Sequence, residues 1–289
     1  MTSTPLLKAN NLKDYLKVDF DIYLKREDLH PLGSHKGRSL PGMIEYYVKQ
    51  GLTDFVISSS GNAGIATALY IIEYNKQTIR KLTLKIFIGK NISRKKYKTL
   101  KKLSKNEMIE LVKTDRPKQQ AFLLDKNNQA KNLRQSSDAI ALVGYEALAE
   151  ELNNDLPNIS EIFIPTSSGT TAVGLWRGFQ KLNNQPKINI VQTTVCHPFV
   201  FSDKKDKKSL AGAIVDKVGH RKKDINYILT ENEQGFVADN KEIKTAIKLI
   251  KKTEKIKISS NSALSVAGLF MKMKEKSLKG NVVCLLTGK

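Results

Sequence analysis

The sequence predicts an α/β protein whose sheet is mostly parallel and is covered by helices on both faces. Three observations lead to this class. Strand-length apolar runs alternate with longer segments of helical periodicity, an alternation typical of parallel sheets. The 289 residues, 40% of them hydrophobic, are enough for two compact domains with full cores. Hydroxyl- and glycine-rich turns follow two of the apolar runs, as they do where helices begin in such folds.

In the first half of the chain, short apolar runs predict strands and amphipathic periodicity predicts helices. The expected elements are a strand at 18–24, a helix after residue 40, a strand at 55–58, a helix from residue 62, a strand at 82–88, a helix at 94–103, a strand at 108–112 and a helix at 118–130.

The second half continues the alternation and ends on an apolar strand. The expected elements are a strand at 162–164, a helix at 171–181, a strand at 188–193, helices at 243–252 and 263–274, and a strand at 282–286.

The net charge of +21 raises the question of an acidic partner. Only 8 of the 49 basic residues are Arg, and the lysines are spread along the chain without interleaved aromatic residues. Nucleic-acid readers rely on Arg and on stacking aromatics. We therefore expect a solvated lysine-rich surface with no nucleic-acid partner, and a non-catalytic basic binding protein stays as the remote alternative.

The cysteines and the apolar runs bear on metal binding and location. Cys196 and Cys284 stand alone, without the spacing of a zinc site or of a disulfide framework. No apolar stretch reaches the roughly 18 residues that a membrane span needs, and residues 1–10 lack a signal-peptide pattern. We expect a cytoplasmic protein with no metal and no membrane partner.

Two turns have the composition of anion sites. Neither GxGxxG nor GxxxxGK[ST] occurs in the required context, so dinucleotide and P-loop fingerprints are missing. Residues 58–64 and 165–171 nevertheless supply Ser, Thr, Asn and Gly directly after apolar strands. Such residues can also serve only as helix N-caps. Two turns of this kind indicate a phosphorylated cofactor beside a carboxylate substrate.

The segment 23–38 contains Lys25-x-Glu27-Asp28-Leu29 followed by Gly33-Ser34-x-Lys36. It resembles the corresponding block of the fold type II pyridoxal-phosphate enzymes, the tryptophan synthase β and threonine synthase superfamily. The resemblance implies pyridoxal 5′-phosphate as cofactor and an architecture of two open, twisted, mostly parallel sheets covered by helices. It also implies that Lys36 is the catalytic lysine, which forms the Schiff base with the cofactor.

The resemblance runs in order along nearly the whole chain. Thr4-Pro5-Leu6 is similar to the opening of the family, and the segments 167–179, 262–269 and 282–288 are most similar to threonine synthase. It implies a large cofactor-binding domain at 1–40 and 141–289, and a small α/β domain at 41–140 that carries the substrate-carboxylate loop.

The matching motifs imply a set of binding residues. Those for the cofactor are Lys36, Asn62, Ser167, Ser168, Gly169, Thr170, Thr171 and Thr287. Those for the substrate carboxylate are Ser59, Ser60, Gly61, Asn62, Ala63 and Gly64. Neutral donors suffice for the phosphate at 167–171, because the start of a helix adds N–H groups and a positive end.

Thr287 implies the type of reaction. By resemblance it faces the pyridine nitrogen, where a hydroxyl leaves the ring unprotonated and favours elimination or replacement over transamination and racemisation. We expect a threonine synthase-like lyase that converts O-phosphohomoserine and water to L-threonine and phosphate. An L-threonine or L-serine ammonia-lyase, or another β-replacement enzyme of this fold, is the alternative, in either case as a monomer or homodimer acting on an amino acid.

Three positions depart from the threonine synthase pattern. His35 replaces the usual Phe, Gly37 replaces the Asp that commonly follows the lysine, and Ser259 stands where a Glu commonly precedes the Ser-Ala pair. These departures concern the substrate rather than the fold.

Overall fold

The computed structural model describes residues 3–59, 61–232, 235–275 and 278–288, and it divides the chain into two compact units. Unit 1 comprises residues 1–30 and 145–289, and unit 2 comprises residues 31–144. We expected boundaries at 40/41 and 140/141. The first boundary lies earlier because helix α2 (Lys36–Lys49) is continuous and packs against helix α3 (Asn62–Gln77) of unit 2, so that Lys36 belongs to unit 2.

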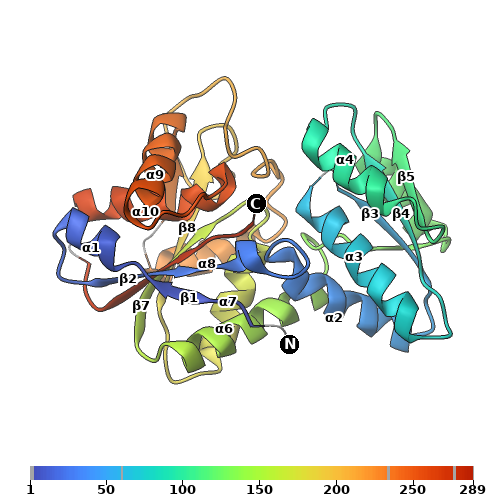
Figure 1. The fold of residues 1–289 in the computed structure, drawn as a ribbon, viewed down its shortest axis with the longest axis horizontal. Helices are drawn as coiled ribbons and strands as arrows, with labels where there is room; N and C mark the ends of the chain where they lie inside the picture. Colours follow the sequence, from blue (N-terminus) through green and yellow to red (C-terminus); the bar gives the residue numbers. More distant parts are fainter. Residues whose placement is uncertain (1–2, 60, 233–234, 276–277, 289) are drawn as a thin grey trace. The chain divides into compact units, whose positions relative to one another are not determined.

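Unit 1 contains a six-stranded sheet with the strand order β1-β2-β10-β7-β8-β9 (Figure 1). All neighbouring strands are parallel except β1 and β2, which pair antiparallel at the edge. The strands are β1 (Leu6–Lys8), β2 (Asp21–Lys25), β7 (Ile159–Pro165), β8 (Lys187–Thr193), β9 (Gly235–Ala238) and β10 (Asn281–Leu285).

Helices cover both faces of this sheet, as Figure 1 shows. One group packs around α10, and the other includes the packed pair α7 and α8. The first group is α1 (Asn10–Leu16), α9 (Asn240–Thr253) and α10 (Ser260–Glu275), and the second is α6 (Val143–Asp155), α7 (Thr170–Gln180) and α8 (Lys222–Asn232). A short 3-10 helix, η1 (Glu27–Leu29), follows β2. Strand β7 is buried along nearly its whole length, as a parallel strand covered on both faces should be.

Unit 2 contains a four-stranded parallel sheet with the order β5-β4-β3-β6. Its strands are β3 (Asp54–Ser58), β4 (Thr83–Ile88), β5 (Ile109–Lys113) and β6 (Lys131–Asn132), and its further helices are α4 (Arg94–Leu103), α5 (Pro117–Lys126) and the 3-10 turn η2 (Ile140–Leu142). Successive residues of β3 serve opposite faces: Phe55 and Ile57 join the core with α2 and α3, whereas Val56 packs with Ala121 of α5.

The predicted fold class, two open and mostly parallel sheets covered by helices, is confirmed. Helix α4 has the predicted bounds, and α3 starts at Asn62 as expected. The expected start of α2 was wrong: this helix begins at Lys36, not after residue 40, and Pro41 lies inside it.

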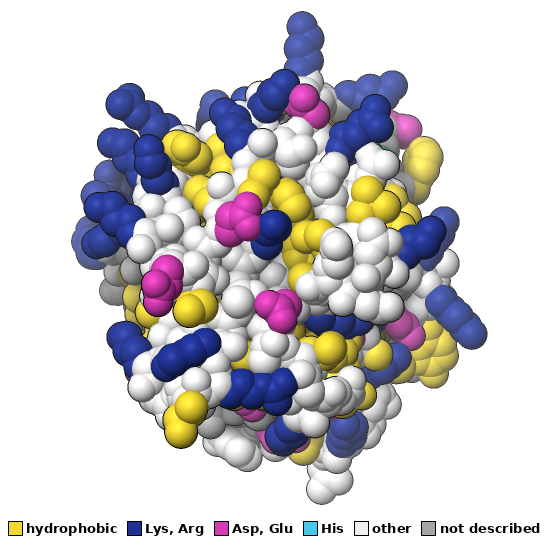
Figure 2. Space-filling model, turned by 90° about the vertical axis from the view of Figure 1, so that its right-hand side faces the viewer, with side chains coloured by type: hydrophobic (Ala, Val, Ile, Leu, Met, Phe, Trp, Pro, Cys, Tyr) yellow, Lys and Arg dark blue, Asp and Glu magenta, His cyan; other side chains and the backbone are white. Residues whose placement is uncertain are grey.

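The basic side chains are dispersed over the surface. On the face shown in Figure 2, Lys and Arg side chains are spread over the whole view, with acidic and uncharged surface between them. This agrees with the even spread of lysines along the sequence.

Candidate active site

Lys36 is the first residue of α2. The chain enters this helix through Gly33, whose φ of +83° is a conformation that glycine adopts without strain. The hydroxyl of buried Ser34 accepts a hydrogen bond from the Lys36 backbone N–H at 3.3 Å. The Lys36 side chain is half-buried, and desolvation lowers the pKa of its amine from 10.5 to about 8.

The predicted carboxylate loop leaves the carboxyl end of β3 and leads into α3. The Ser59 hydroxyl accepts hydrogen bonds from the backbone N–H groups of Gly61 (3.3 Å) and Gly64 (3.0 Å), so it braces the turn. A Cβ on Gly64 would lie 2.9 Å from the Ser59 carbonyl oxygen, which explains the glycine there. Ser60 lies outside the described residues.

Asn62 and Ala63 form the start of α3, and both are partly exposed. The Ala63 carbonyl accepts a hydrogen bond from the Thr67 hydroxyl. The Asn62 Oδ1 accepts one from Nζ of Lys96, at 3.0 Å. Lys96 belongs to α4, and nothing in the sequence pattern singled it out among the lysines of that helix.

The predicted phosphate turn connects β7 to α7 in unit 1. Gly169 precedes the helix with a φ of +86°, and a Cβ on it would lie 2.9 Å from Cγ1 of Ile225. Both facts require glycine at this position. Thr170 and Thr171, the first residues of α7, are buried.

The hydroxyls of this turn have different partners. The Ser167 Oγ accepts hydrogen bonds from the backbone N–H groups of Val215 and Asp216, both at 3.1 Å, and thereby ties the turn to a neighbouring loop. The Ser168 and Thr170 hydroxyls lie 2.9 Å apart.

A cation also contacts the turn. Nε of Arg221, a residue only 8% exposed, donates to the Thr170 Oγ1 at 3.3 Å. We expected neutral donors alone, and Arg221 was missed because it stands in a basic run, 220–223, far from the turn in sequence.

Thr287 follows β10, the strand that lies between β2 and β7. Because β10 and β7 are parallel, Thr287 and the 167–171 turn leave the same edge of the sheet from neighbouring strands. Thr287 is 5% exposed. The next residue, Gly288, is fixed on both sides: its N–H donates to the Ser262 Oγ at 3.2 Å, and its carbonyl accepts from the hydroxyls of Ser262 and Ser259. Ser259, one of the departures noted above, thus anchors the end of the chain.

Lys25, Arg26 and Asp28 form ion pairs and hydrogen bonds within unit 1. Lys25 is fully buried and pairs with Glu151 and Asp155 at 2.5 and 3.0 Å. Arg26 donates two hydrogen bonds of 2.9 Å to the carboxylate of Asp28. These pairs satisfy the charges of the block within unit 1.

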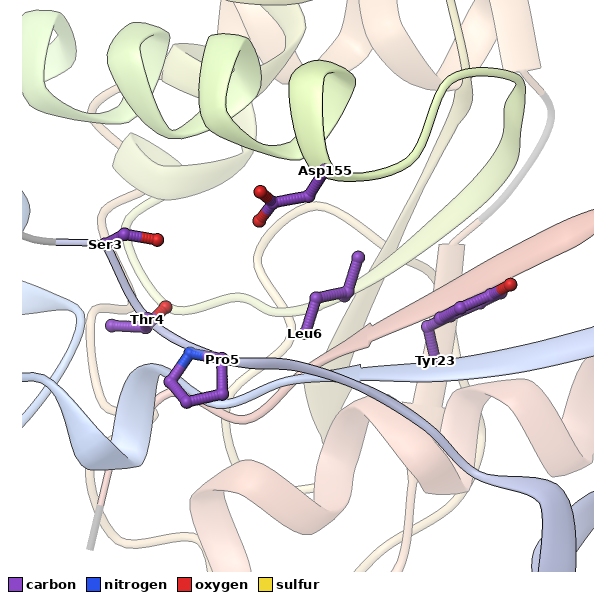
Figure 3. Close-up of a pocket in the computed structure, with 6 residues that line it drawn as sticks. All are labelled: Ser3, Thr4, Pro5, Leu6, Tyr23 and Asp155. Atoms are coloured by element: carbon purple, nitrogen blue, oxygen red, sulfur yellow. The ribbon is translucent and has the colours of Figure 1, made fainter.

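A shallow surface pocket of about 520 Å³ lies elsewhere in unit 1 and contains none of the predicted site residues. Figure 3 shows Asp155, at the end of α6, beside the N-terminal segment that carries Thr4 and Leu6. The Asp155 carboxylate already pairs with Lys25. We assign no ligand to this pocket.

Among the described residues, no three His, Cys, Asp or Glu side chains are grouped in a way that would hold a metal ion. No helix in the described part of the chain combines the length and the apolar character needed to cross a membrane.

The two α/β units, one with a lysine of lowered pKa at a helix start and the other with a hydroxyl-rich turn, agree with the resemblance to the fold type II pyridoxal-phosphate enzymes. The model of the family "Pyridoxal-phosphate dependent enzyme" matches residues 1–288, and the chain belongs to this family. Its cofactor is pyridoxal 5′-phosphate, and it is an enzyme of the tryptophan synthase β group.

Similar proteins catalyse different reactions. The chain is 24% identical over 313 residues to the threonine synthase of Methanocaldococcus jannaschii, covering 99% of this chain and 74% of the relative. It is 25% identical over 300 residues to the mitochondrial threonine dehydratase of Schizosaccharomyces pombe, covering 99% and 48%. A solved pyridoxal 5′-phosphate-dependent aspartate racemase superposes with a TM-score of 0.82 at 19% identity, covering 99% of this chain and 89% of the other. That last likeness shows the fold alone.

Proposed function

We propose that the chain is a threonine synthase-like lyase that converts O-phosphohomoserine and water to L-threonine and phosphate. The observation that carries the proposal is Thr287, a buried neutral hydroxyl fixed at the same sheet edge as the phosphate turn. The similarity to threonine synthase along 99% of the chain supports the same reaction class. The cofactor supplies the electron sink when bound.

Lys36 has the acid-base property that its role needs. A pKa of about 8 instead of 10.5 raises the fraction of neutral amine at pH 7 roughly 300-fold. Lys36 would hold the cofactor through this neutral amine. When a substrate amine takes its place, the Lys36 amine would be positioned to accept the α-proton and to donate it to another carbon of the substrate.

The 167–171 turn fits the cofactor phosphate. The turn leads into the start of α7, and the start of a helix offers backbone N–H groups and the positive end of the helix dipole to an anion. Gly169, where a Cβ would clash, shapes the cradle, and Ser168, Thr170 and Thr171 supply hydroxyls. The buried Arg221 adds a positive charge next to Thr170, which stabilises a dianion more than neutral donors alone.

The loop after β3 fits the remaining polar groups. Asn62 would donate to the phenolic oxygen of the cofactor, and the loop at the start of α3, which the Ser59 hydroxyl braces, would hold the substrate carboxylate. Thr287 would donate its hydroxyl to the pyridine nitrogen, and a neutral hydroxyl does not hold a proton on the ring as a carboxylate would. A bound cofactor with an unprotonated ring would supply chemistry that favours elimination and replacement over transamination.

A second candidate is an L-threonine or L-serine ammonia-lyase. The similarity to a threonine dehydratase also extends over 99% of the chain. This reaction needs the same lysine, turn and carboxylate loop but no place for a phosphate on the substrate. The two candidates therefore share every residue proposed above.

Product analysis separates the two candidates. The cofactor-loaded enzyme is incubated separately with O-phosphohomoserine, L-threonine and L-serine, and phosphate, threonine and 2-oxo acid are measured. We expect equal amounts of phosphate and threonine from O-phosphohomoserine, and none from a Lys36→Ala control. Turnover of threonine or serine to 2-oxo acid without turnover of O-phosphohomoserine would contradict the first candidate and support the second.

A further inference from the structure

One contact in unit 2 is not used by the function proposed above. Helix α4 carries exposed lysines such as Lys95 and Lys98, whereas Lys96 is half-buried and reaches the start of α3. Its Nζ donates to the Asn62 Oδ1 at 3.0 Å. The same atom lies 3.3 Å from the point where a Cβ on Gly61 would be, so glycine leaves room for the ammonium group.

The chemistry of the two groups determines which way the Asn62 amide faces. An ammonium group has only donors, and an amide has one accepting oxygen and a donating NH₂ group. A lysine can therefore bond only the oxygen, so the assignment does not depend on distinguishing oxygen from nitrogen in the structure. With Oδ1 held by Lys96, the Asn62 NH₂ group faces away from Lys96 and has its donors available for an acceptor.

The surroundings of Lys96 support a specific role over a solvated surface charge. Desolvation lowers the pKa of Lys96, and the charge of neighbouring Lys95 lowers it further. Among the described residues no carboxylate forms an ion pair with Lys96. The cost of placing a partly desolvated ammonium group here is offset by its bond to Asn62.

We propose that Lys96 is a positioning residue that holds the Asn62 amide with its NH₂ group directed at the phenolic oxygen of bound pyridoxal phosphate. The inference rests on the function proposed above, in which Asn62 donates to that oxygen. If the amide were reversed, two acceptor oxygens would face one another and repel. Lys96 acts through Asn62 and does not itself touch the cofactor.

A double-mutant cycle tests this directly. The dissociation constant of pyridoxal phosphate is measured by titrating the cofactor-free protein and following visible absorbance. Lys96→Met keeps the bulk and removes the donor, and we expect it to weaken binding about tenfold, the equivalent of one charged hydrogen bond. Lys98→Met, an exposed change of the same charge on the same helix, should change it less than twofold. In an Asn62→Ala background, Lys96→Met should have no further effect.

The possible outcomes distinguish a failure of this inference from a failure of the proposed function. An equal loss from Lys96→Met in both backgrounds would show that Lys96 acts independently of Asn62, and would overturn the inference. The inference would also be overturned if Lys96→Met bound pyridoxal phosphate as tightly as the unaltered protein while Asn62→Ala bound it weakly. Unchanged binding by Asn62→Ala would instead refute the proposed role of Asn62. If Lys96→Met fails to fold, Lys96→Arg and Lys96→Gln are measured instead. Lys96→Arg, which like lysine has only donors, should retain the affinity for pyridoxal phosphate within about threefold, and Lys96→Gln should bind it more weakly. Equal affinities of these two variants would overturn the inference.

Discussion

Lys36 is partly removed from water, and in its charged form it destabilises the folded protein. Desolvation holds the pKa of Lys36 at about 8, below its ordinary value of 10.5. The folded protein therefore binds fewer protons than the unfolded chain between about pH 8 and 10.5, and its stability rises with pH across that window. Below it, the full penalty of the charged amine remains.

Replacing Lys36 by Met should therefore stabilise the cofactor-free protein in a pH-dependent way. We expect the free energy of unfolding to rise by about 1 kcal/mol or more at pH 7, because no buried charge remains, and the gain to disappear near pH 10.5. Urea unfolding at both pH values measures this, with Lys49→Met, an exposed change on the same helix, as control. An identical gain at both pH values would contradict the lowered pKa.

Thr287 determines the reaction type in our account, and its replacement should redirect the chemistry. Thr287→Asp introduces a carboxylate that stabilises a protonated ring, so we expect slower elimination, a new long-wavelength absorption band and racemised or transaminated products. Thr287→Ser keeps the hydroxyl and should keep the product distribution. Unaltered spectra and products in Thr287→Asp would mean that this residue does not touch the ring.

At the scale of elements, the site depends on turns at the carboxyl ends of parallel strands. The 167–171 turn is tied to its surroundings through Ser167, which holds the 215–216 backbone, and through Thr170, which contacts Arg221. Residues 287–288 are tied to the start of α10 by Ser259 and Ser262. These ties place donors on rigid supports, which lowers the cost of ordering them on binding.

Replacing Gly169 in the phosphate turn should strain the protein and weaken its binding of the cofactor. Gly169→Ala puts a Cβ at a φ of +86° and 2.9 Å from Ile225, so we expect about 1–3 kcal/mol of strain and weaker cofactor binding. Gly212→Ala, where a Cβ meets nothing within 4 Å, is the control and should have an effect of about 0.5 kcal/mol or less. Equal cofactor affinities for the two variants would argue against a phosphate at this turn.

The elements with strong periodicity could be predicted from sequence, whereas very short strands and a helix start obscured by a proline could not. Helix α4 and the start of α3 follow from apolar spacing. Strand β1 has three residues that are half-buried or exposed, and β6 has two, so neither carries a period-two signal. Pro41 inside α2 concealed the true start of that helix at Lys36.

The same limit applies to the site. Lys36, Asn62 and the two turns could be recognised from local motifs, because each motif is contiguous in sequence. Arg221 and Lys96 could not, since their contacts with Thr170 and Asn62 join residues 51 and 34 positions apart and exist only in the folded units.

For the molecule as a whole, the net charge of +21 raises the question whether it binds nucleic acid. The basic side chains are dispersed on the face seen in Figure 2, with acidic and uncharged surface between them. We predict weak binding to single- or double-stranded DNA that is lost when salt rises from about 50 to 200 mM, as for sequence-independent phosphate attraction. A complex that survives this salt change, or that competes with pyridoxal phosphate, would contradict that prediction.

The central claim is that Lys36, among the 41 lysines of the chain, carries the cofactor. Borohydride reduction of the cofactor-loaded protein fixes the cofactor on the lysine that holds it, and proteolysis with mass spectrometry identifies that residue. The account predicts the label on the peptide containing Lys36, and no label when Lys36→Ala is treated in the same way. A label on any other lysine of the unmodified protein would contradict it.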